Sequence, residues 1–286
     1  MFVVLGASGH TGKVVAQTLL GQKMKVRVVL RDAAKEKTWR DAGADVVVAD
    51  VDDGTALERA FSGAEGAYLL LPPNFSSNHV RVDNNRRARA LAGAIETAGV
   101  PHVVLLSSVG AQQSEGTGPV LGLHDAEAVF SRARAAVTSI RAAYFMENWG
   151  QSLSSLGGGV FPTFLTMDKA IPLVATRDIG TAAARLLSEG GRGKRVIELA
   201  GPREYTPRDV AAGVERLVGR PISVQQVPEE AMAPALMEAG MNAEWARLFQ
   251  ELTHGLNANV VVWEGDHPFW RGETDLEALL PTLLGK

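Results

Sequence analysis

The chain of 286 residues contains no cysteine. Disulfide bonds, thiol nucleophiles and thiolate metal sites are therefore excluded. Its 29 basic and 32 acidic residues leave a formal net charge of −3, which gives no electrostatic reason to expect binding to nucleic acid or to an anionic membrane. The histidines include no close pair, so we expect no metal site; they are His10, His79, His102, His124, His254 and His267.

The sequence also lacks an apolar run long enough to span a bilayer. No signal peptide precedes the first apolar segment, so the expected location is cytoplasmic. The basic cluster at 86–89 is interpreted as the solvated face of a helix. With 46% hydrophobic residues, a chain of this length forms one large domain or one domain with a smaller annex.

Short apolar runs alternate with helical segments over the first half of the chain. Strands are expected at 1–5, 25–30, 45–49, 66–71, 102–106 and 137–141. This alternation with short turns predicts an α/β fold built on a doubly wound parallel sheet. From about residue 142 the alternation breaks, and a helix is expected to open at 143–149. A small α+β region should follow.

The first expected strand runs directly into the glycine-rich stretch 6–12, G-A-S-G-H-T-G, and then into a helix. Gly6 lets the chain turn off the strand, Gly9 lets the backbone approach a pyrophosphate, and Gly12 lets the helix pack close to the sheet. The helix N-terminus favours a bound anion. The stretch also carries three side chains that could donate to phosphate, Ser8, His10 and Thr11. In this position the motif predicts nucleotide binding rather than an ordinary turn.

Arg31 and Asp32 follow the second expected strand, about 20 residues past the glycine turn, where such folds read the adenosine ribose. A carboxylate here accepts from the 2′-hydroxyl of NAD, whereas a guanidinium pairs with the 2′-phosphate of NADP. Because Arg31 comes first, we favour NADP(H). The alternative is that Arg31 is a solvated loop residue and Asp32 caps the next helix.

Further cofactor contacts are expected where the later strands end. The loop that begins with Asp50 and Val51 is placed to meet the adenine, and Asp50 is the favoured contact. Leu71 and Pro72 end the fourth strand beside the expected nicotinamide, because proline cannot continue a central strand. We interpret residues 1–150 as a Rossmann-type NAD(P)-binding domain and 151–286 as a smaller C-terminal substrate-binding region interleaved with it.

An ordered set of motifs resembles the NmrA-like group of atypical short-chain dehydrogenases. It resembles most the branch of type-2 quinone oxidoreductase and triphenylmethane reductase. The matching pieces are G-A-S-G-H-T-G at 6–12, L-R-D at 30–32, A-D-V-D-D at 49–53, L-L-L-P-P at 69–73, L-L-S-S-V-G-A at 105–111 and S-I-R-A-A-Y-F-M-E-N-W at 139–149. The resemblance implies a Rossmann domain, NADP(H), and either a reductase of quinones or similar acceptors or a dinucleotide sensor without chemistry.

One departure concerns the proton donor. Typical short-chain dehydrogenases use Tyr-x-x-x-Lys, in which the lysine lowers the pKa of the tyrosine. Tyr68, Tyr144 and Tyr205 are followed four residues on by proline, asparagine and aspartate. The pair is therefore absent.

Three other catalytic candidates remain, and each has a plainer alternative. Ser108, and with it the cofactor candidate Ser107, could bind the nicotinamide carboxamide or a substrate oxygen, or simply cap its own turn. His124 could donate a proton, or be a surface or capping residue. Tyr144 could line the nicotinamide pocket or serve packing.

Two functions follow. The first is an NADPH-dependent reductase that transfers hydride to a small conjugated acceptor such as a quinone or dye. The second is a non-catalytic NADP(H)-binding redox sensor that acts through a protein partner. We expect a monomer or a homodimer.

Overall fold

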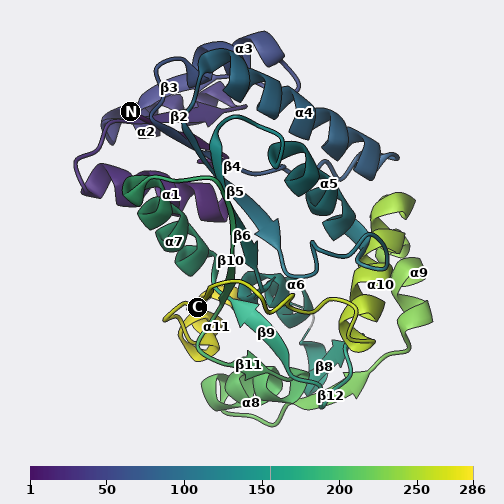
Figure 1. Ribbon diagram of the computed structural model, residues 1–286. Helices are drawn as coiled ribbons and strands as arrows, with labels where there is room; N and C mark the ends of the chain where they lie inside the picture. The colour runs from purple at the N-terminus through teal and green to yellow at the C-terminus, as the bar shows by residue number, and fades with distance from the viewer. Residues whose placement is uncertain (155, 286) are drawn as a thin grey trace.

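The computed structural model describes residues 1–154 and 156–285. Among these residues, eight parallel strands form one sheet in the order β13-β10-β6-β5-β4-β1-β2-β3 (Figure 1). The chain runs from β1 to β2 and β3 on one side, and then crosses to β4, β5 and β6 on the other. This confirms the predicted α/β fold with a doubly wound sheet. The strands are β1 (Phe2–Leu5), β2 (Val26–Leu30), β3 (Asp45–Val48), β4 (Gly66–Leu69), β5 (His102–Ser108), β6 (Ala136–Ala142), β10 (Lys194–Ala200) and β13 (Phe269–Arg271).

Helices cover both faces of this sheet, as its central strands require, because β1 and β4 are apolar and buried along most of their length. Helices α1 and α7 lie side by side on one face, and α3, α4 and α5 cover the other (Figure 1). Short α2 packs beside the edge strand β3. The bounds are α1 (His10–Gly21), α2 (Glu36–Asp41), α3 (Gly54–Phe61), α4 (Val80–Ala98), α5 (Leu121–Phe130) and α7 (Thr176–Glu189).

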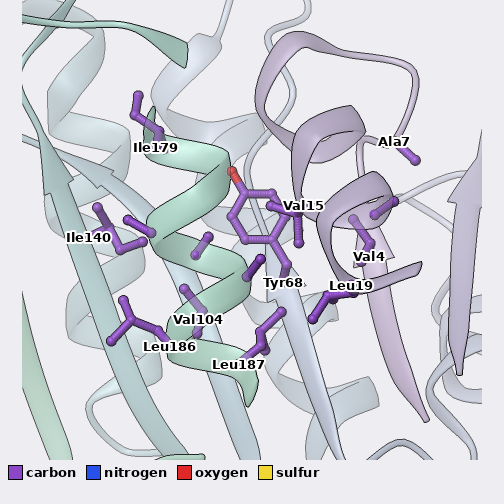
Figure 2. Close-up of a cluster of buried hydrophobic side chains, with 14 of the residues drawn as sticks. Val4, Ala7, Val15, Leu19, Tyr68, Val104, Ile140, Ile179, Leu186 and Leu187 are labelled. Carbon is purple, nitrogen blue, oxygen red and sulfur yellow. The ribbon is translucent and has the colours of Figure 1, made fainter. Parts of the chain in front are cut away.

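The core on the α1 and α7 face contains a tyrosine among aliphatic side chains (Figure 2). Val15 and Leu19 of α1 and Leu186 of α7 are fully buried with Tyr68 of β4. The Tyr68 hydroxyl donates to Oγ1 of Thr11 at 2.9 Å, so its polar atom is satisfied despite burial. This contact ties the centre of the sheet to the first turn of α1.

Apart from α7, most elements after residue 142 lie beyond the carboxyl ends of the main-sheet strands (Figure 1). The chain also returns to the main sheet as β10 and β13. Strands β11, β9 and β7 form a three-stranded sheet, and β12 pairs with β8. The elements are β7 (Tyr144–Phe145), α6 (Trp149–Ser154), β8 (Val160–Thr163), β9 (Ile171–Val174), β11 (Glu204–Tyr205), α8 (Pro207–Val218), β12 (Ser223–Gln226), α9 (Met232–Glu238), α10 (Ala243–Asn257) and α11 (Leu276–Leu283). Short 3₁₀ turns are η1 (Ala33–Lys35), η2 (Gly118–Val120), η3 (Met146–Asn148), η4 (Gly157–Gly159) and η5 (Glu229–Ala231).

The expected helix at 143–149 is wrong at its start. Tyr144 and Phe145 form β7, because they pair with Leu173 and Val174 of β9, and η3 begins only at Met146. A partner strand about thirty residues away decides this conformation, and local propensity does not reveal it.

No helix in the described ranges is both long and apolar enough to cross a membrane. The same residues contain no cluster of three or more side chains suited to holding a metal ion.

Candidate active site

A cavity of about 780 Å³ lies at the carboxyl ends of the central strands. It follows the switch point of the sheet, where β1 has β2 on one side and β4 on the other. Its lining includes ten of the residues predicted to bind a cofactor: Gly6, Ser8, Gly9, His10, Thr11, Arg31, Val51, Leu71, Pro72 and Ser107. Two of the three catalytic candidates, Ser108 and Tyr144, line it as well.

The glycine turn has a backbone that side chains would disrupt. Gly6 has φ of +68°, in the left-handed region that favours glycine. A Cβ on Gly12 would lie 2.4 Å from the carbonyl oxygen of Gly6 and 2.7 Å from that of Leu5. Gly12 does not line the cavity; it lets α1 begin directly against the end of β1.

The N-terminus of α1 faces the cavity. Within the described chain, Gly9 at the N-cap makes no side-chain capping contact, and the first turn carries no acidic residue. The first amide groups of a helix have no acceptor inside it, and the helix dipole favours an anion there. Thr11 Oγ1 accepts from Tyr68, so its own proton stays available to an oxygen of the ligand. These groups fit the pyrophosphate of a dinucleotide.

Two cations line the cavity at the end of β2. The exposed side chain of Arg31 is joined there by Lys35, which sequence reasoning missed. Asp32 has a different role, because its Oδ1 accepts from the amide of Ala34 at 2.9 Å and caps η1. The capping alternative for Asp32 is therefore correct. With two cations and one carboxylate, the net charge at this edge is positive.

The loop after β3 contributes Val51 to the cavity but not Asp50. The Asp50 Oδ1 accepts from the amide of Asp52 at 2.9 Å and stabilises the loop itself. The structure thus places the apolar neighbour, Val51, where an adenine contact was expected from Asp50.

The interpretation of 86–89 as a solvated face is wrong for Arg87, which is only 7% exposed. Its Nη2 donates to Asp52 at 3.0 Å, and its Nη1 donates to the carbonyl of Pro72 at 3.3 Å. The hydrogen bond from Arg87 lowers the pKa of Asp52. Arg87 thereby joins the loops after β3 and β4, which form neighbouring walls of the cavity.

Ser107 and Ser108 are the last residues of β5, which extends two residues further than predicted. The Ser107 hydroxyl donates to Oε1 of Glu127 on α5. The Ser108 hydroxyl donates to the carbonyl of Val109 at 3.0 Å, which is the local turn contact considered above. Both serines therefore use their protons on the protein.

Tyr144 lines the cavity together with Asn148, which sequence reasoning missed. Burial raises the pKa of Tyr144, although a hydrogen bond with Asn148 opposes that effect. A phenol with a raised pKa stays protonated and is a weaker acid than a free phenol. In the same stretch, Glu147 accepts from the amide of Thr176 at 2.9 Å and from its hydroxyl at 2.6 Å. This contact attaches the start of α7 to the Tyr144 segment.

His124 is not among the residues that line the cavity. Its Nδ1 lies 2.8 Å from the carbonyl oxygen of Ala111, the backbone-capping role considered as its alternative. The preceding residue on α5, Leu123, lines the cavity instead, because consecutive residues of a helix point in different directions.

Seven apolar residues line another part of the cavity, which we call the apolar end: Pro119, Val120, Leu123, Trp245, Leu252, Leu256 and Val261. Trp245 of α10 is held by its indole Nε1, which donates to the carbonyl of Asn74 at 2.8 Å. Phe75 packs against it with ring centroids 4.8 Å apart. Among the described lining residues, the aspartate, arginine and lysine side chains are Asp32, Arg31 and Lys35, all near the end of β2. The apolar end itself carries no charge.

The sequence profile of the NmrA-like family matches residues 1–274. The chain belongs to the NmrA-like family. The resemblance inferred from the motifs is thereby confirmed. Two relatives align with this chain over most of its length and of their own. The NAD(P)H azoreductase of Xenophilus azovorans is 24% identical, over 88% of this chain and 86% of its own length. Quinone oxidoreductase 2 of Escherichia coli is 29% identical over 84% of this chain and 82% of its own.

Solved structures of the NmrA-like fold agree with this placement. The NADPH-dependent quinone oxidoreductase of E. coli, solved with NADPH, has a TM-score of 0.84 at 25% identity and covers 99% of both chains. The triphenylmethane reductase of Citrobacter sp., solved with NADP(H), has a TM-score of 0.78 at 21% identity and covers 100% of this chain and 96% of its own. The second likeness concerns the fold alone.

Proposed function

We propose that this protein is an NADPH-dependent reductase that transfers hydride to a small, conjugated acceptor such as a quinone or a dye. The observation that carries this proposal is one cavity with two unlike ends. One end has the α1 N-terminus and two cations, which suit the phosphates of a dinucleotide. The other is the uncharged apolar end, which suits a flat organic molecule. Similarity to a quinone oxidoreductase and an azoreductase supports the same reaction class.

NADP(H) is the cofactor that the charges at β2 favour. Arg31 and Lys35 can pair with a 2′-phosphate, and these two cations outnumber the single carboxylate at this edge, Asp32, whose Oδ1 caps η1. The residues proposed to hold the cofactor are Gly6, Ser8, Gly9, His10, Thr11, Gly12, Arg31, Val51, Leu71, Pro72 and Ser107.

A bound reduced nicotinamide supplies the hydride. The chain must orient the acceptor, exclude water and provide a proton. Tyr144 is the proposed donor because it lines the cavity; burial raises its pKa, so its hydroxyl is protonated but is a weaker acid than a free phenol. Ser108 can accept a hydrogen bond but has placed its proton on Val109. His124 could act only through a rearrangement of its contact with Ala111.

The test is turnover with a matched pair of acceptors. NADPH oxidation is followed by absorbance with a neutral naphthoquinone and with its sulfonated derivative, which has the same ring system and an added negative charge. We expect turnover of the neutral quinone and a KM at least about tenfold higher for the sulfonate, because burying an unpaired charge is costly. An absence of turnover with every quinone and dye tried, despite tight NADPH binding, would refute the proposed reaction.

That negative result would favour the second candidate, a redox sensor that binds NADP(H) and a protein partner. Its supporting observation is the missing Tyr-x-x-x-Lys pair. A sensor requires different affinities for the oxidised and reduced cofactor, which titration calorimetry measures directly; equal affinities would exclude it. For either function, we expect a monomer or a homodimer.

A further inference from the structure

The hydrogen bonding of Ser107 decides whether its hydroxyl can act as a donor or as an acceptor toward a ligand. Ser107 lines the cavity at the end of β5 and is 2% exposed. Its Oγ donates to Oε1 of Glu127. A hydroxyl has one proton and two lone pairs. With that proton directed to Glu127, Ser107 can offer a ligand only an acceptor.

Arg141 keeps Glu127 from returning a proton. The Arg141 Nε donates to Oε1 of Glu127 at 3.1 Å, and its Nη2 donates to Oε2 at 2.8 Å. The two side chains are 7% and 14% exposed. A guanidinium stays protonated in proteins, and a two-point contact with it matches an ionised carboxylate, which accepts and does not donate. Glu127 therefore holds the Ser107 proton in one orientation.

The position of Arg141 is fixed from two sides. On β6 it lies opposite Ser107 in the register with β5, so the sheet itself brings the two residues together. Its Nη1 donates to Oε2 of Glu264, which also contacts His267 Nε2 at 2.9 Å. The amide of Glu264 in turn donates to Glu198 at 2.9 Å. The arrangement of Ser107, Glu127 and Arg141 is thus anchored by α5, the sheet and the segment before β13.

We propose that Glu127 and Arg141 are positioning residues that make Ser107 an obligate hydrogen-bond acceptor, and that Ser107 thereby selects the amino group of the nicotinamide carboxamide. This inference rests on the proposed binding of NADP(H). An acceptor at the end of β5 favours an N–H group and repels a carbonyl oxygen, which fixes the orientation of the carboxamide.

The test compares the affinities of three oxidised cofactors in the absence of any acceptor. They are NADP⁺, its thionicotinamide analogue, which keeps the amino group, and its 3-acetylpyridine analogue, which has a methyl group there instead. Titration calorimetry gives each Kd. For the unaltered protein we expect similar affinities for the first two and about tenfold weaker binding of the acetylpyridine analogue, as for one lost hydrogen bond.

Glu127→Gln tests the role of the charge. A glutamine amide can donate to Ser107, which frees the hydroxyl to donate into the cavity. The ratio of the Kd of the acetylpyridine analogue to that of NADP⁺ should then fall from about ten to about one. If Glu127 had only a structural role, the substitution would lower the affinity for all three cofactors equally. Glu264→Gln is the matched control, because it removes the other carboxylate on Arg141 without contacting Ser107, and it should keep the preference.

Ser107→Ala provides a second variant that does not alter the buried ion pair, and it should also abolish the preference. An unchanged ratio in both Ser107→Ala and Glu127→Gln would overturn the inference. Failure of the unaltered protein to bind NADP⁺ at all would instead overturn the proposed function, so the two failures are distinguishable.

Discussion

Replacing Arg31 with alanine should weaken NADPH much more than NADH. The Arg31 side chain is exposed at the cavity edge, and the ion pairs of the described helix beside it join Lys37 to Asp41 and Arg40 to Glu36 instead. Its removal should therefore leave the folded protein intact. A hydrogen-bonded cation on a phosphate contributes about 1.5–3 kcal/mol, and exposure favours the lower value. We expect about tenfold loss of NADPH affinity and almost no loss of NADH affinity.

The assay is a calorimetric titration of both cofactors against the unaltered protein, Arg31→Ala and a control. Arg40→Ala is the control, since Arg40 has the same charge, lies on α2 and does not line the cavity. Lys35→Ala should add a smaller loss, confined to NADPH, and both losses should diminish at high salt. An equal loss of NADPH and NADH affinity in Arg31→Ala would refute the reading of the 2′-phosphate.

Three other predictions concern the turn, the proton donor and stability. In thermal melts, Gly12→Ala should lower the free energy of unfolding by about 1–3 kcal/mol, because its Cβ would lie 2.4 Å from the Gly6 carbonyl oxygen, and it should also weaken cofactor binding. Gly21→Ala is the control and should leave the melting temperature unchanged, because a Cβ there has no atom within 4 Å in the described part of the chain. Tyr144→Phe should lower kcat with quinones by about 10²-fold and leave NADPH affinity unchanged; an unchanged kcat would assign the proton to water. Burial, with Arg195 nearby, lowers the pKa of His102 from 6.5 to about 4, so the unfolded chain takes up a proton there first as the pH falls. The contribution of His102 to the free energy of unfolding should be fully present above about pH 6.5, and the free energy of unfolding from urea melts should fall by about 2 kcal/mol between pH 7 and pH 5. His102→Gln should remove this dependence on pH, and an identical dependence in the variant would contradict the assignment.

The residues that line the cavity at the ends of β1 and β2 could be predicted because their signals are local. Gly6 through Gly12 and Arg31 lie at strand ends, and the doubly wound order of the sheet brings such ends together. Lys35 was within reach of the same reasoning, since it follows Arg31 by four residues and carries the same charge. These residues need only the strand assignment to be placed.

Side-chain direction and distant partners could not be predicted. Asp50 and Val51 are neighbours in one loop, and only the fold shows which of them faces the cavity. His124 and Leu123 differ in the same way on α5. Trp245 enters the site from a helix about 170 residues after its hydrogen-bond partner Asn74, and no pattern in the sequence relates the two. The three residues of β13 were missed because so short a strand has no periodicity of its own.

The return of the chain to the main sheet as β10 and β13 has a consequence for how members of such a family can diverge. The segments that supply Tyr144 and Trp245 leave the sheet after β6 and after β10, and each rejoins it at a neighbouring strand. Both ends of each segment are therefore fixed in the main sheet. Lengthening such a segment adds little entropic cost, so insertions and substitutions there can reshape the apolar end of the cavity while the sheet keeps the residues at the ends of β1 and β2 in place. Under the proposed function, new acceptors could then be acquired without rebuilding the proposed cofactor site.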